Sequence, residues 1–348
     1  MTAFDAAREM GHEQVVLVQD RDAGLVAIIA IHDTTLGHAV GGTRMRLYGS
    51  LDEAAMDALR LSRAMTYKAA MAGVPYGGGK AVILGDPGRD KSRALLVAYA
   101  KALDRLGGRF QTGCDMGIDG RDVAVLSRLT KHASHTAPDS KLQTADLSAL
   151  GVFVSIRAVA RRLGRDLAGL HVAVQGLGQL GYRLAERLAS AGARLTVADV
   201  DPGRAERAAA AFGAAVVGPE EIVAADADVF SPNAGGSVID DGAVGRLRCR
   251  AVVGGANEQL AEPRHGDALF ERGVLFAPDY VVNAGGLLSL LYEIGELDEA
   301  GVVARVESIG DRVVEILDRA EAEGVPPHRL ADRMAEERVA AARERKKP

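Results

Sequence analysis

Two lysines and one aspartate are the residues of this sequence best suited to proton transfer. Lys68 lies in the segment MTYK, Lys80 follows three consecutive glycines, and Asp115 begins the segment DMGIDG. Neighbouring lysines disfavour each other's charge, so one of them is expected to lose its proton more readily than an isolated lysine. A carboxylate beside them would complete a proton-transfer set. The simpler alternatives are two solvated lysines and an aspartate that only caps a helix.

The glycines before Lys80 do not form a nucleotide phosphate loop. Such a loop has the pattern GxxxxGK followed by Ser or Thr, whose hydroxyl holds magnesium. Here Val74 occupies the first glycine position and Ala81 follows the lysine. We expect instead a glycine loop that enters a short strand at Ala81–Leu84. Without side chains, this loop would let a substrate or another backbone approach closely.

A capped helix is predicted between Ser50 and Gly73, and it carries Lys68 in its last turns. Ser50 and Glu53 have the spacing of a capping box, in which each side chain bonds a free backbone N–H of the first turn. Gly73 can adopt the left-handed conformation that ends a helix, and Pro75 prevents its continuation.

The elements around this helix predict an α/β domain. Apolar, β-branched runs separated by a polar turn indicate a hairpin of Val15–Gln19 and Leu25–Ile31. A glycine-rich connection is expected at Asp33–Met45 and a helix at Ser92–Leu106. A short strand at Arg109–Gly113 would present Asp115 at its carboxyl end, where function concentrates in α/β sheets.

The cysteine and histidines of this half are not predicted to form a nucleophile or a metal site. Cys114 has no partnered histidine, and a small buried thiol is the expected state. His132 and His135 have the spacing H-x-x-H without a third ligand at a useful distance. They belong to the segment Lys131–Ser148, which we expect to connect two domains.

The clearest binding pattern is a glycine-rich turn between a strand and a helix. The buried strand His171–Gln175 leads into GLGQLG, a helix follows to Ala191, and the next strand, Arg194–Ala198, ends at Asp199. In this context GxGxxG predicts dinucleotide binding, with the pyrophosphate at the helix N-terminus. The residues expected around the pyrophosphate are Gly176, Leu177, Gly178, Gln179, Leu180 and Gly181.

Asp199 is expected to accept hydrogen bonds from the adenosine ribose hydroxyls. Because its charge would repel a 2′-phosphate, the sequence favours NAD over NADP. Arg204 is the nearby cation that would act in the opposite direction.

Three further short strands are predicted at Asp228–Pro232, Ala251–Gly254 and Val274–Ala277. Each leads into a small polar loop, and these loops contain Asn233, Asn257 and Asn283. The nicotinamide and the substrate are expected at these carboxyl ends. A helix from Leu287 to Ile294 follows; its residues Leu287 and Leu290 lie on one side, with core packing as the simpler role. Long helices are expected at Val302–Glu323 and Pro327–Glu344.

The composition is that of a soluble α/β protein of about two domains. The chain has 348 residues, 26% charged and 48% hydrophobic, and a net charge of −5. That charge gives no indication of nucleic-acid or acidic-membrane partners. Two cysteines are not a disulfide framework, and no signal peptide or membrane span is recognisable. We therefore expect a cytoplasmic protein without a metal.

Taken together, these motifs resemble those of the leucine, valine and phenylalanine dehydrogenases, with leucine and valine dehydrogenase the closest. MTYK, GGGKAVI, an Asp after a strand, QGLGxxG and APDYVVNAGG occur in the family's order over nearly the whole chain. The resemblance implies NAD-dependent reversible oxidative deamination of an L-amino acid to its 2-oxo acid and ammonia. It also implies a substrate and oligomerisation domain at 1–140, a Rossmann domain at 141–326, an active-site cleft between them, and a C-terminal helix at 327–348 that packs back on the first domain.

The resemblance also assigns roles to particular residues. Lys80 and Asp115 match the catalytic lysine and the acid/base aspartate, and Lys68 matches the lysine that binds the substrate carboxylate. Ser148 and Asn257 match positions on the cofactor side. The other positions implied to contact substrate are Val40, Gly41, Gly113, Asn283, Leu287 and Leu290. The chain departs from the family pattern at 138–148, where Ser148 replaces a threonine, at Asn233, which replaces a cysteine, and at Glu258, which replaces an asparagine.

A branched-chain amino acid is the expected substrate, because Leu287 and Leu290 would fill space in an apolar pocket. An aromatic amino acid is the alternative, because Gly113 leaves room for a ring. An alternative of another class is a non-catalytic NAD-binding regulatory protein. The expected partners are the amino acid, its oxo acid, ammonia and further copies of this chain.

Overall fold

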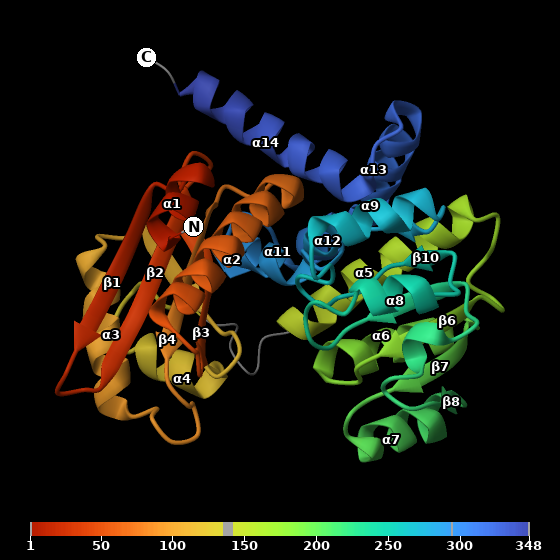
Figure 1. The fold of residues 1–348 in the computed structure, drawn as a ribbon, viewed down its shortest axis with the longest axis horizontal. Helices are drawn as coiled ribbons and strands as arrows, with labels where there is room; N and C mark the ends of the chain where they lie inside the picture. Colours follow the sequence, from red (N-terminus) through yellow and green to blue (C-terminus); the bar gives the residue numbers. More distant parts are fainter. Residues whose placement is uncertain (1, 135–141, 294, 347–348) are drawn as a thin grey trace. The chain divides into compact units, whose positions relative to one another are not determined.

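The computed structural model describes residues 2–134, 142–293 and 295–346 and forms two compact units (Figure 1). The first unit comprises Met1–Ala137 together with Ala335–Pro348, and the second comprises Pro138–Met334. Each unit contains one β-sheet with helices packed on it.

The sheet of the first unit has the strand order β1-β2-β4-β3-β5. The predicted hairpin is confirmed as β1 (Gln14–Asp20) and β2 (Leu25–Asp33), which pair antiparallel. β4 (Gly77–Leu84) is antiparallel to β2 and parallel to β3 (Ala39–Arg46), which is parallel to β5 (Phe110–Gly113). The carboxyl ends of β4, β3 and β5 therefore lie at one edge of the sheet.

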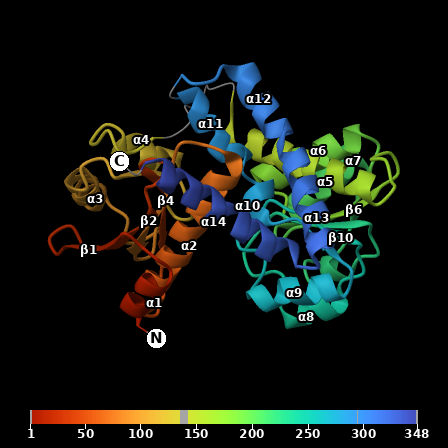
Figure 2. The ribbon, with the colours of Figure 1, turned by 90° about the horizontal axis from the view of Figure 1, so that it is seen from above.

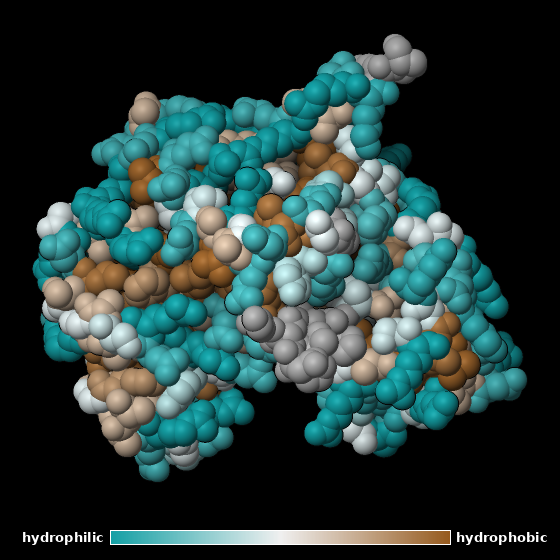
Figure 3. All heavy atoms as spheres, turned by 180° about the vertical axis from the view of Figure 1, so that it is seen from behind, coloured by the Kyte–Doolittle hydropathy of each residue, from teal (hydrophilic) through white to brown (hydrophobic). Residues whose placement is uncertain are grey.

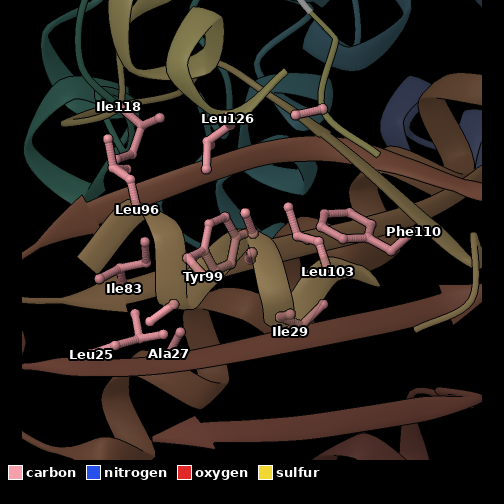
Figure 4. Close-up of a cluster of buried hydrophobic side chains, with 14 of the residues drawn as sticks. Leu25, Ala27, Ile29, Ile83, Leu96, Tyr99, Leu103, Phe110, Ile118 and Leu126 are labelled. Carbon is pink, nitrogen blue, oxygen red and sulfur yellow. The ribbon is translucent and has the colours of Figure 1, made fainter. Parts of the chain in front are cut away.

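Helices cover both faces of this sheet. α3 (Arg93–Arg105) and α4 (Gly120–Leu126) pack on the face that contains Ile29 and Ile83 (Figure 4). α1 (Ala3–Glu9) and α2 (Leu51–Ala72) pack on the opposite face, against Ile28 and Val82. Because side chains alternate along a strand, Lys80 lies on the α2 face together with Val82.

The predicted boundaries of α2 are confirmed, but one detail of its cap is wrong. The Ser50 side chain accepts from the Glu53 N–H, and Gly73 ends the helix in the left-handed conformation with φ +66°. The Glu53 carboxylate, however, accepts from the N–H of Gly49 and not from that of Ser50. The cap is therefore shifted outward by one residue relative to a reciprocal capping box.

The glycines expected in loops lie within strands β3 and β4. A Cβ on Gly78 would lie 2.1 Å from the backbone nitrogen of Thr66 in α2, and one on Gly41 would lie 1.8 Å from the carbonyl oxygen of Gly79. The predictions of a connection through residue 45 and of a strand beginning only at Ala81 were therefore wrong. These glycines permit close packing of backbone on backbone, which outweighs the low strand propensity of glycine.

The sheet of the second unit is parallel and has the order β11-β10-β9-β6-β7-β8. Numbered from its first strand in sequence, this is the order 3-2-1-4-5-6 of a dinucleotide-binding Rossmann fold, which confirms the predicted fold class. The strands are β6 (His171–Gln175), β7 (Arg194–Ala198), β8 (Ala215–Val216), β9 (Val229–Pro232), β10 (Ala251–Val252) and β11 (Leu275–Phe276).

Helices surround this second sheet. α5 packs against α6, α11 and α13, as Figure 2 shows for α5 and α13. The helical segments of this unit are α5 (Thr144–Arg162), α6 (Gln179–Ser190), α7 (Pro202–Phe212), a 3₁₀ turn at Ile222–Ala224, α8 (Asp241–Arg246), α9 (Pro263–Glu271), α10 (Asp279–Val282), α11 (Gly285–Glu293), α12 (Glu299–Glu307) and α13 (Ile309–Glu323). The last helix, α14 (Pro327–Arg345), begins in this unit, and its residues from Ala335 onward belong to the first unit.

Two predicted boundaries in this unit were wrong. The helix expected over Val302–Glu323 is divided at Ser308, the C-cap of α12 and N-cap of α13. The connection expected over Lys131–Ser148 ends earlier, because α5 begins at Thr144. Residues 135–141 of that segment, including His135, lie outside the described residues.

Large apolar side chains are exposed at separate places along the chain, among them Phe4, Leu17, Leu47 and Met116. On the face shown in Figure 3, hydrophobic patches alternate with hydrophilic ones. Within the described ranges, every helix is too short or too polar to cross a membrane.

Candidate active site

Lys80 and Asp115 form an ion pair in the first unit. Lys80 lies in β4 and is 5% exposed, and its Nζ bonds the Oδ2 of Asp115, which follows β5. The pair spans β3, which lies between those two strands. The register of Val40 with Gly78 and of Thr43 with Ala81 puts Gly42 opposite Lys80.

Gly42 explains how the lysine reaches across a strand. A Cβ at this position would lie 3.0 Å from the Cβ of Asp115 and 2.2 Å from the carbonyl oxygen of Cys114. A side chain here would displace Asp115. The second glycine of the GG pair in β3 therefore keeps the path between lysine and carboxylate open, a role that the sequence did not reveal.

The Asp115 carboxylate is held by three donors. Besides Lys80, Arg44 Nε donates to Oδ1 at 3.3 Å and the backbone N–H of Met116 donates to Oδ1 at 2.5 Å. Burial alone would raise the pKa of Asp115, but the charges of Lys80 and Arg44 outweigh it and hold the pKa below its ordinary value. The carboxylate is therefore ionised and oriented.

Arg44 was not identified from the sequence. It lies in β3 on the same face as Lys80, opposite Val82. Its other nitrogen, NH1, donates to Asp57 Oδ2 at 3.1 Å, and Asp57 in α2 is 5% exposed. One sequence pattern could have identified Arg44: every second residue from Gly42 to Arg46 lies on the same face of β3. Using this pattern required recognising the glycine-rich segment as a strand.

The other predicted substrate positions of this unit lie around the same strands. Lys68 lies in α2, two residues after Thr66, which abuts Gly78 in β4. Val40 is buried opposite Gly78, and Gly41 is packed against the backbone of Gly79. Gly113 ends β5 beside β3, and a Cβ there would lie 3.4 Å from the carbonyl oxygen of Ser134.

Cys114 is exposed, so the expectation of a buried thiol was wrong. The residue directly follows Gly113, the last residue of β5. Partial burial and the nearby carboxylates of Asp119 and Asp122 raise its pKa. A raised pKa keeps the group as a thiol, which is a poor nucleophile. The expected cap is confirmed at Asp119, whose side chain accepts from the N–H groups of Arg121 and Asp122.

In the second unit the glycine turn has the geometry of a phosphate cradle. Gly176 has φ +83°, and a Cβ on Gly181 would lie 1.9 Å from the Gly176 carbonyl oxygen. At Gly178 a Cβ would meet no heavy atom within 4 Å. Gly178 is also the N-cap of α6 and provides no side-chain cap, so the first-turn N–H groups of Gln179 and Leu180 face open space that suits an anion.

Asp199 lies at the end of β7 beside this turn. Its Oδ2 accepts from the Leu177 N–H at 2.6 Å and its Oδ1 from the Asp201 N–H at 2.9 Å. A carboxylate has about four acceptor positions, so capacity for hydroxyl donors remains. Arg204 Nε lies 3.4 Å from Asp201, which engages the cation that would favour a 2′-phosphate.

Three asparagines predicted at the carboxyl ends of β9, β10 and β11 converge. Asn283 donates to Asn257 Oδ1 at 2.8 Å and to the Gly255 carbonyl at 3.1 Å. Asn233 Oδ1 accepts from the Gly255 N–H at 2.9 Å. The Oδ1 of Asn283 is buried and has no hydrogen-bond partner within the described part of the chain. Leu180 of the glycine turn packs on Gly255, so this network adjoins the cradle.

Leu287 and Leu290 are half-buried, whereas Leu288 and Leu291 of the same helix lie in the core. The first two therefore differ in exposure from the core leucines of their own helix. Ser148 adjoins their helix, because its Oγ would lie 2.8 Å from a Cβ on Gly286. Ser148 of α5 thus lies beside the first turn of α11, the helix that carries both leucines.

Comparison with known proteins identifies what this chain resembles. Residues 12–132 match the model described as "Glu/Leu/Phe/Val dehydrogenase, dimerisation domain", and residues 204–346 match "Glutamate/Leucine/Phenylalanine/Valine dehydrogenase". A leucine dehydrogenase of Thermoactinomyces intermedius is 42% identical over 343 residues, which cover 97% of this chain and 94% of that protein.

Relatives that act on aromatic amino acids are as similar. A phenylalanine dehydrogenase of Thermoactinomyces intermedius is 43% identical, covering 97% of this chain and 93% of its own. An L-tryptophan dehydrogenase of Nostoc punctiforme is 44% identical, covering 97% of this chain and 96% of its own. The crystal structure of L-tryptophan dehydrogenase from that organism has a TM-score of 0.84 to this chain at 42% identity, covering 98% of this chain and 99% of that one.

Proposed function

Because the chain belongs to the Glu/Leu/Phe/Val dehydrogenase family and is an apolar amino-acid dehydrogenase, we propose that it oxidatively deaminates a branched-chain L-amino acid with NAD. The reaction converts amino acid, NAD⁺ and water to 2-oxo acid, ammonium, NADH and a proton, and it is reversible. The observation that carries the proposal is the ion pair between the buried Lys80 and Asp115, which contact each other across Gly42, where no side chain stands between them.

The first unit supplies the groups that move protons. Lys80 deprotonates either the substrate amine or the water that attacks the iminium carbon. Asp115, oriented by Arg44 and the Met116 N–H, passes protons to and from the substrate nitrogen. Lys68 in α2 binds the α-carboxylate through its charge. Val40, Gly41 and Gly113 border the substrate side chain.

The second unit supplies the dinucleotide site, and its residues fit an NAD molecule. The open space at Gly178 and the uncapped first turn of α6 suit the pyrophosphate, and Asp199 suits the ribose hydroxyls. NAD held by these residues would supply the hydride acceptor for the substrate Cα. Asn257, Asn283 and Ser148 hold the carboxamide and substrate groups near that ring, and the buried unsatisfied Oδ1 of Asn283 is an acceptor for a ligand donor.

NAD is proposed over NADP because Asp199 carries a charge and Arg204 is engaged by Asp201. The family itself is NAD(P)-dependent. Steady-state kinetics with both cofactors test the preference. An Asp199→Ser variant should lose NAD efficiency while its relative efficiency with NADP rises, and NADP turnover equal to NAD turnover in the wild type would contradict the assignment.

A branched-chain substrate is favoured by the half-buried Leu287 and Leu290, which would occupy space in the pocket. An aromatic substrate is the second candidate, and the specific observation behind it is Gly113: among the described residues, the Ser134 carbonyl oxygen alone lies within 4 Å of a Cβ built there. One methylene in an apolar pocket discriminates by about 1–3 kcal/mol, so side-chain size is a fine distinction.

The test is NADH absorbance with purified protein, NAD and a panel of L-amino acids at alkaline pH. Lys80→Ala should lose turnover while still binding NADH, whereas Lys101→Ala, an exposed lysine of α3, should match the wild type. Turnover of leucine, valine and isoleucine supports the proposal. Turnover of phenylalanine or tryptophan far above leucine supports the second candidate. NADH binding without turnover of any amino acid would refute both.

We also propose that residues 1–140 with the helix at 327–348 form the substrate and oligomerisation domain, and 141–326 the dinucleotide domain. The description of the model matching 12–132 as a dimerisation domain supports a homo-oligomer, which light scattering tests. The two free cysteines, Cys114 and Cys249, favour a reducing cytoplasm, which cell fractionation tests.

A further inference from the structure

Arg44 bridges the buried carboxylate of Asp57 and the partly exposed carboxylate of Asp115, which come from different elements. Its Nε donates to Asp115 Oδ1 at 3.3 Å, in the loop after β5, and its NH1 donates to Asp57 Oδ2 at 3.1 Å, in α2. Only 14% of its side chain is exposed. A planar guanidinium that is bound at both ends has one orientation, and that orientation determines where the Asp115 carboxylate points.

Asp57 is itself anchored independently of Arg44. The Tyr48 hydroxyl donates to Asp57 Oδ2 at 2.8 Å, and Arg60 lies 3.4 Å from Oδ1. Arg46 Nε lies 3.8 Å from Oδ2. If Arg44 were removed, Asp57 would keep these three partners, whereas Asp115 would keep two among the described residues, Lys80 and the Met116 N–H. The loss of Arg44 therefore acts on Asp115 and not on Asp57.

We propose that Arg44 is a positioning residue for the deamination reaction. It holds the Asp115 carboxylate so that one oxygen faces Lys80 and the other stays bound, and it keeps the carboxylate ionised. Asp57 is the anchor that fixes Arg44. This inference rests on the proposed roles of Lys80 and Asp115.

The charges around Asp115 give the proposal a pH signature. Asp115 is faced by Lys80 from β4 and Arg44 from β3, and Arg44 is in turn faced by Asp57 and Tyr48. Burial would raise the pKa of Asp115, and the two cations hold it down. Without Arg44, one cation fewer opposes the effect of burial, so the pKa of Asp115 rises. The acid limb of the plot of activity against pH, where Asp115 becomes protonated, then moves to higher pH.

The experiment compares Arg44→Gln and Arg44→Lys with Arg60→Gln, which loses a contact to the same Asp57 but none to Asp115. The readouts are kcat and KM for the amino acid from about pH 4 to about pH 10, NADH affinity, and Tm; the acid end of this range is needed because an aspartate ordinarily titrates at about pH 3.9. Arg44→Gln should lower kcat by roughly 10- to 100-fold, since misplacing a catalytic group has effects of that size. Its acid limb should rise by about one pH unit, the usual effect of one opposite charge. NADH affinity should be unchanged.

The conservative variant separates orientation from charge. Arg44→Lys keeps the cation but cannot span both carboxylates, so kcat should recover only partly while the acid limb returns to its wild-type position. Arg60→Gln should stay within about threefold of the wild type at every pH, as expected for an exposed ion pair.

Two outcomes would overturn the inference. One is an Arg44→Gln enzyme with the kcat and pH profile of Arg60→Gln. The other, if Arg44→Gln does not fold, is an Arg44→Lys enzyme with unaltered kcat. Failure of the proposed function looks different, because the wild type itself would then turn over no amino acid.

Discussion

Two glycines three residues apart in the dinucleotide turn should respond to alanine in opposite ways. A Cβ on Gly181 would lie 1.9 Å from the carbonyl oxygen of Gly176, inside van der Waals contact with rigid backbone. A Cβ on Gly178 would meet no heavy atom within 4 Å, and its φ of −65° is accessible to alanine. The first substitution should damage folding, and the second should damage ligand binding.

The magnitudes follow from these contacts. Overpacking costs about 1–3 kcal/mol, and the backbone clash at Gly181 puts it at the upper end, about 3 kcal/mol. For a unit of this size that lowers Tm by roughly 6–12 °C. Gly178→Ala changes only an N-cap preference, about 1 kcal/mol or less. Its methyl group would occupy the space proposed for the pyrophosphate, and losing one charge-assisted hydrogen bond weakens NADH binding by roughly 10- to 150-fold.

The assays are calorimetric unfolding without ligand and NADH titration. The chain contains no tryptophan, so binding is followed by the fluorescence of NADH itself or by isothermal calorimetry. Gly178→Ala should have a Tm close to that of the wild type and weak NADH binding. Gly181→Ala should have a clearly lower Tm and a smaller loss of NADH affinity. A Gly178→Ala protein that binds NADH as the wild type does would refute the assignment of that space to the cofactor.

Three further substitutions test how a close backbone contact, a buried histidine and a strained backbone angle affect stability. Gly78→Ala should destabilise the first unit by about 3 kcal/mol or prevent its folding, because the new Cβ would lie 2.1 Å from the Thr66 nitrogen. Thermal unfolding followed by circular dichroism measures the change in Tm, and a Tm equal to that of the wild type would contradict the prediction. Burial, aided by the neighbouring His32, lowers the pKa of His12 to about 4, so the unfolded chain binds more protons between pH 6.5 and 4 and stability falls over that range. After a discount for partial exposure, the free energy of unfolding should fall by about 1–2 kcal/mol as the pH is lowered through this range. Urea unfolding at about pH 7 and about pH 4.5 measures this fall, which should be smaller in the His12→Gln variant. Glu258 has φ +52°, a backbone conformation that asparagine tolerates better than glutamate. Glu258→Asn should therefore raise the free energy of unfolding of the second unit by about 0.5–1 kcal/mol in urea. A lower free energy of unfolding in this variant would refute the strain argument.

The elements whose signals are local were predicted correctly. The boundaries of α2 follow from Ser50 and Gly73, and the Rossmann turn follows from glycine spacing between a strand and a helix. Asp199 also lies where the pattern expects it, beside the glycine turn. In each case the informative residues lie within about 25 positions of one another, so no long-range contact was needed to interpret them.

The errors share one physical cause. Gly41, Gly42 and Gly77–Gly79 were assigned to loops because glycine disfavours strands, but each is required by a close neighbour from elsewhere in the chain. That neighbour is the Phe110 ring at Gly79 and backbone at the other four. Cys114 was expected to be buried because thiols usually are, and the turn after β5 exposes it. Such choices depend on neighbours that the sequence does not place.

The sequence alone determined the chemistry of this protein, because the residue types and their order carry the family pattern: two lysines, an aspartate after a strand and a dinucleotide turn. Only the tertiary structure decided how those groups are arranged. The strand order β4-β3-β5 puts Lys80 and Asp115 on either side of β3, Gly42 leaves the path between them free, and Arg44 with Asp57 completes the set. Strand order and register are set by long-range packing, and a one-residue shift in register would turn Lys80 to the opposite face of the sheet.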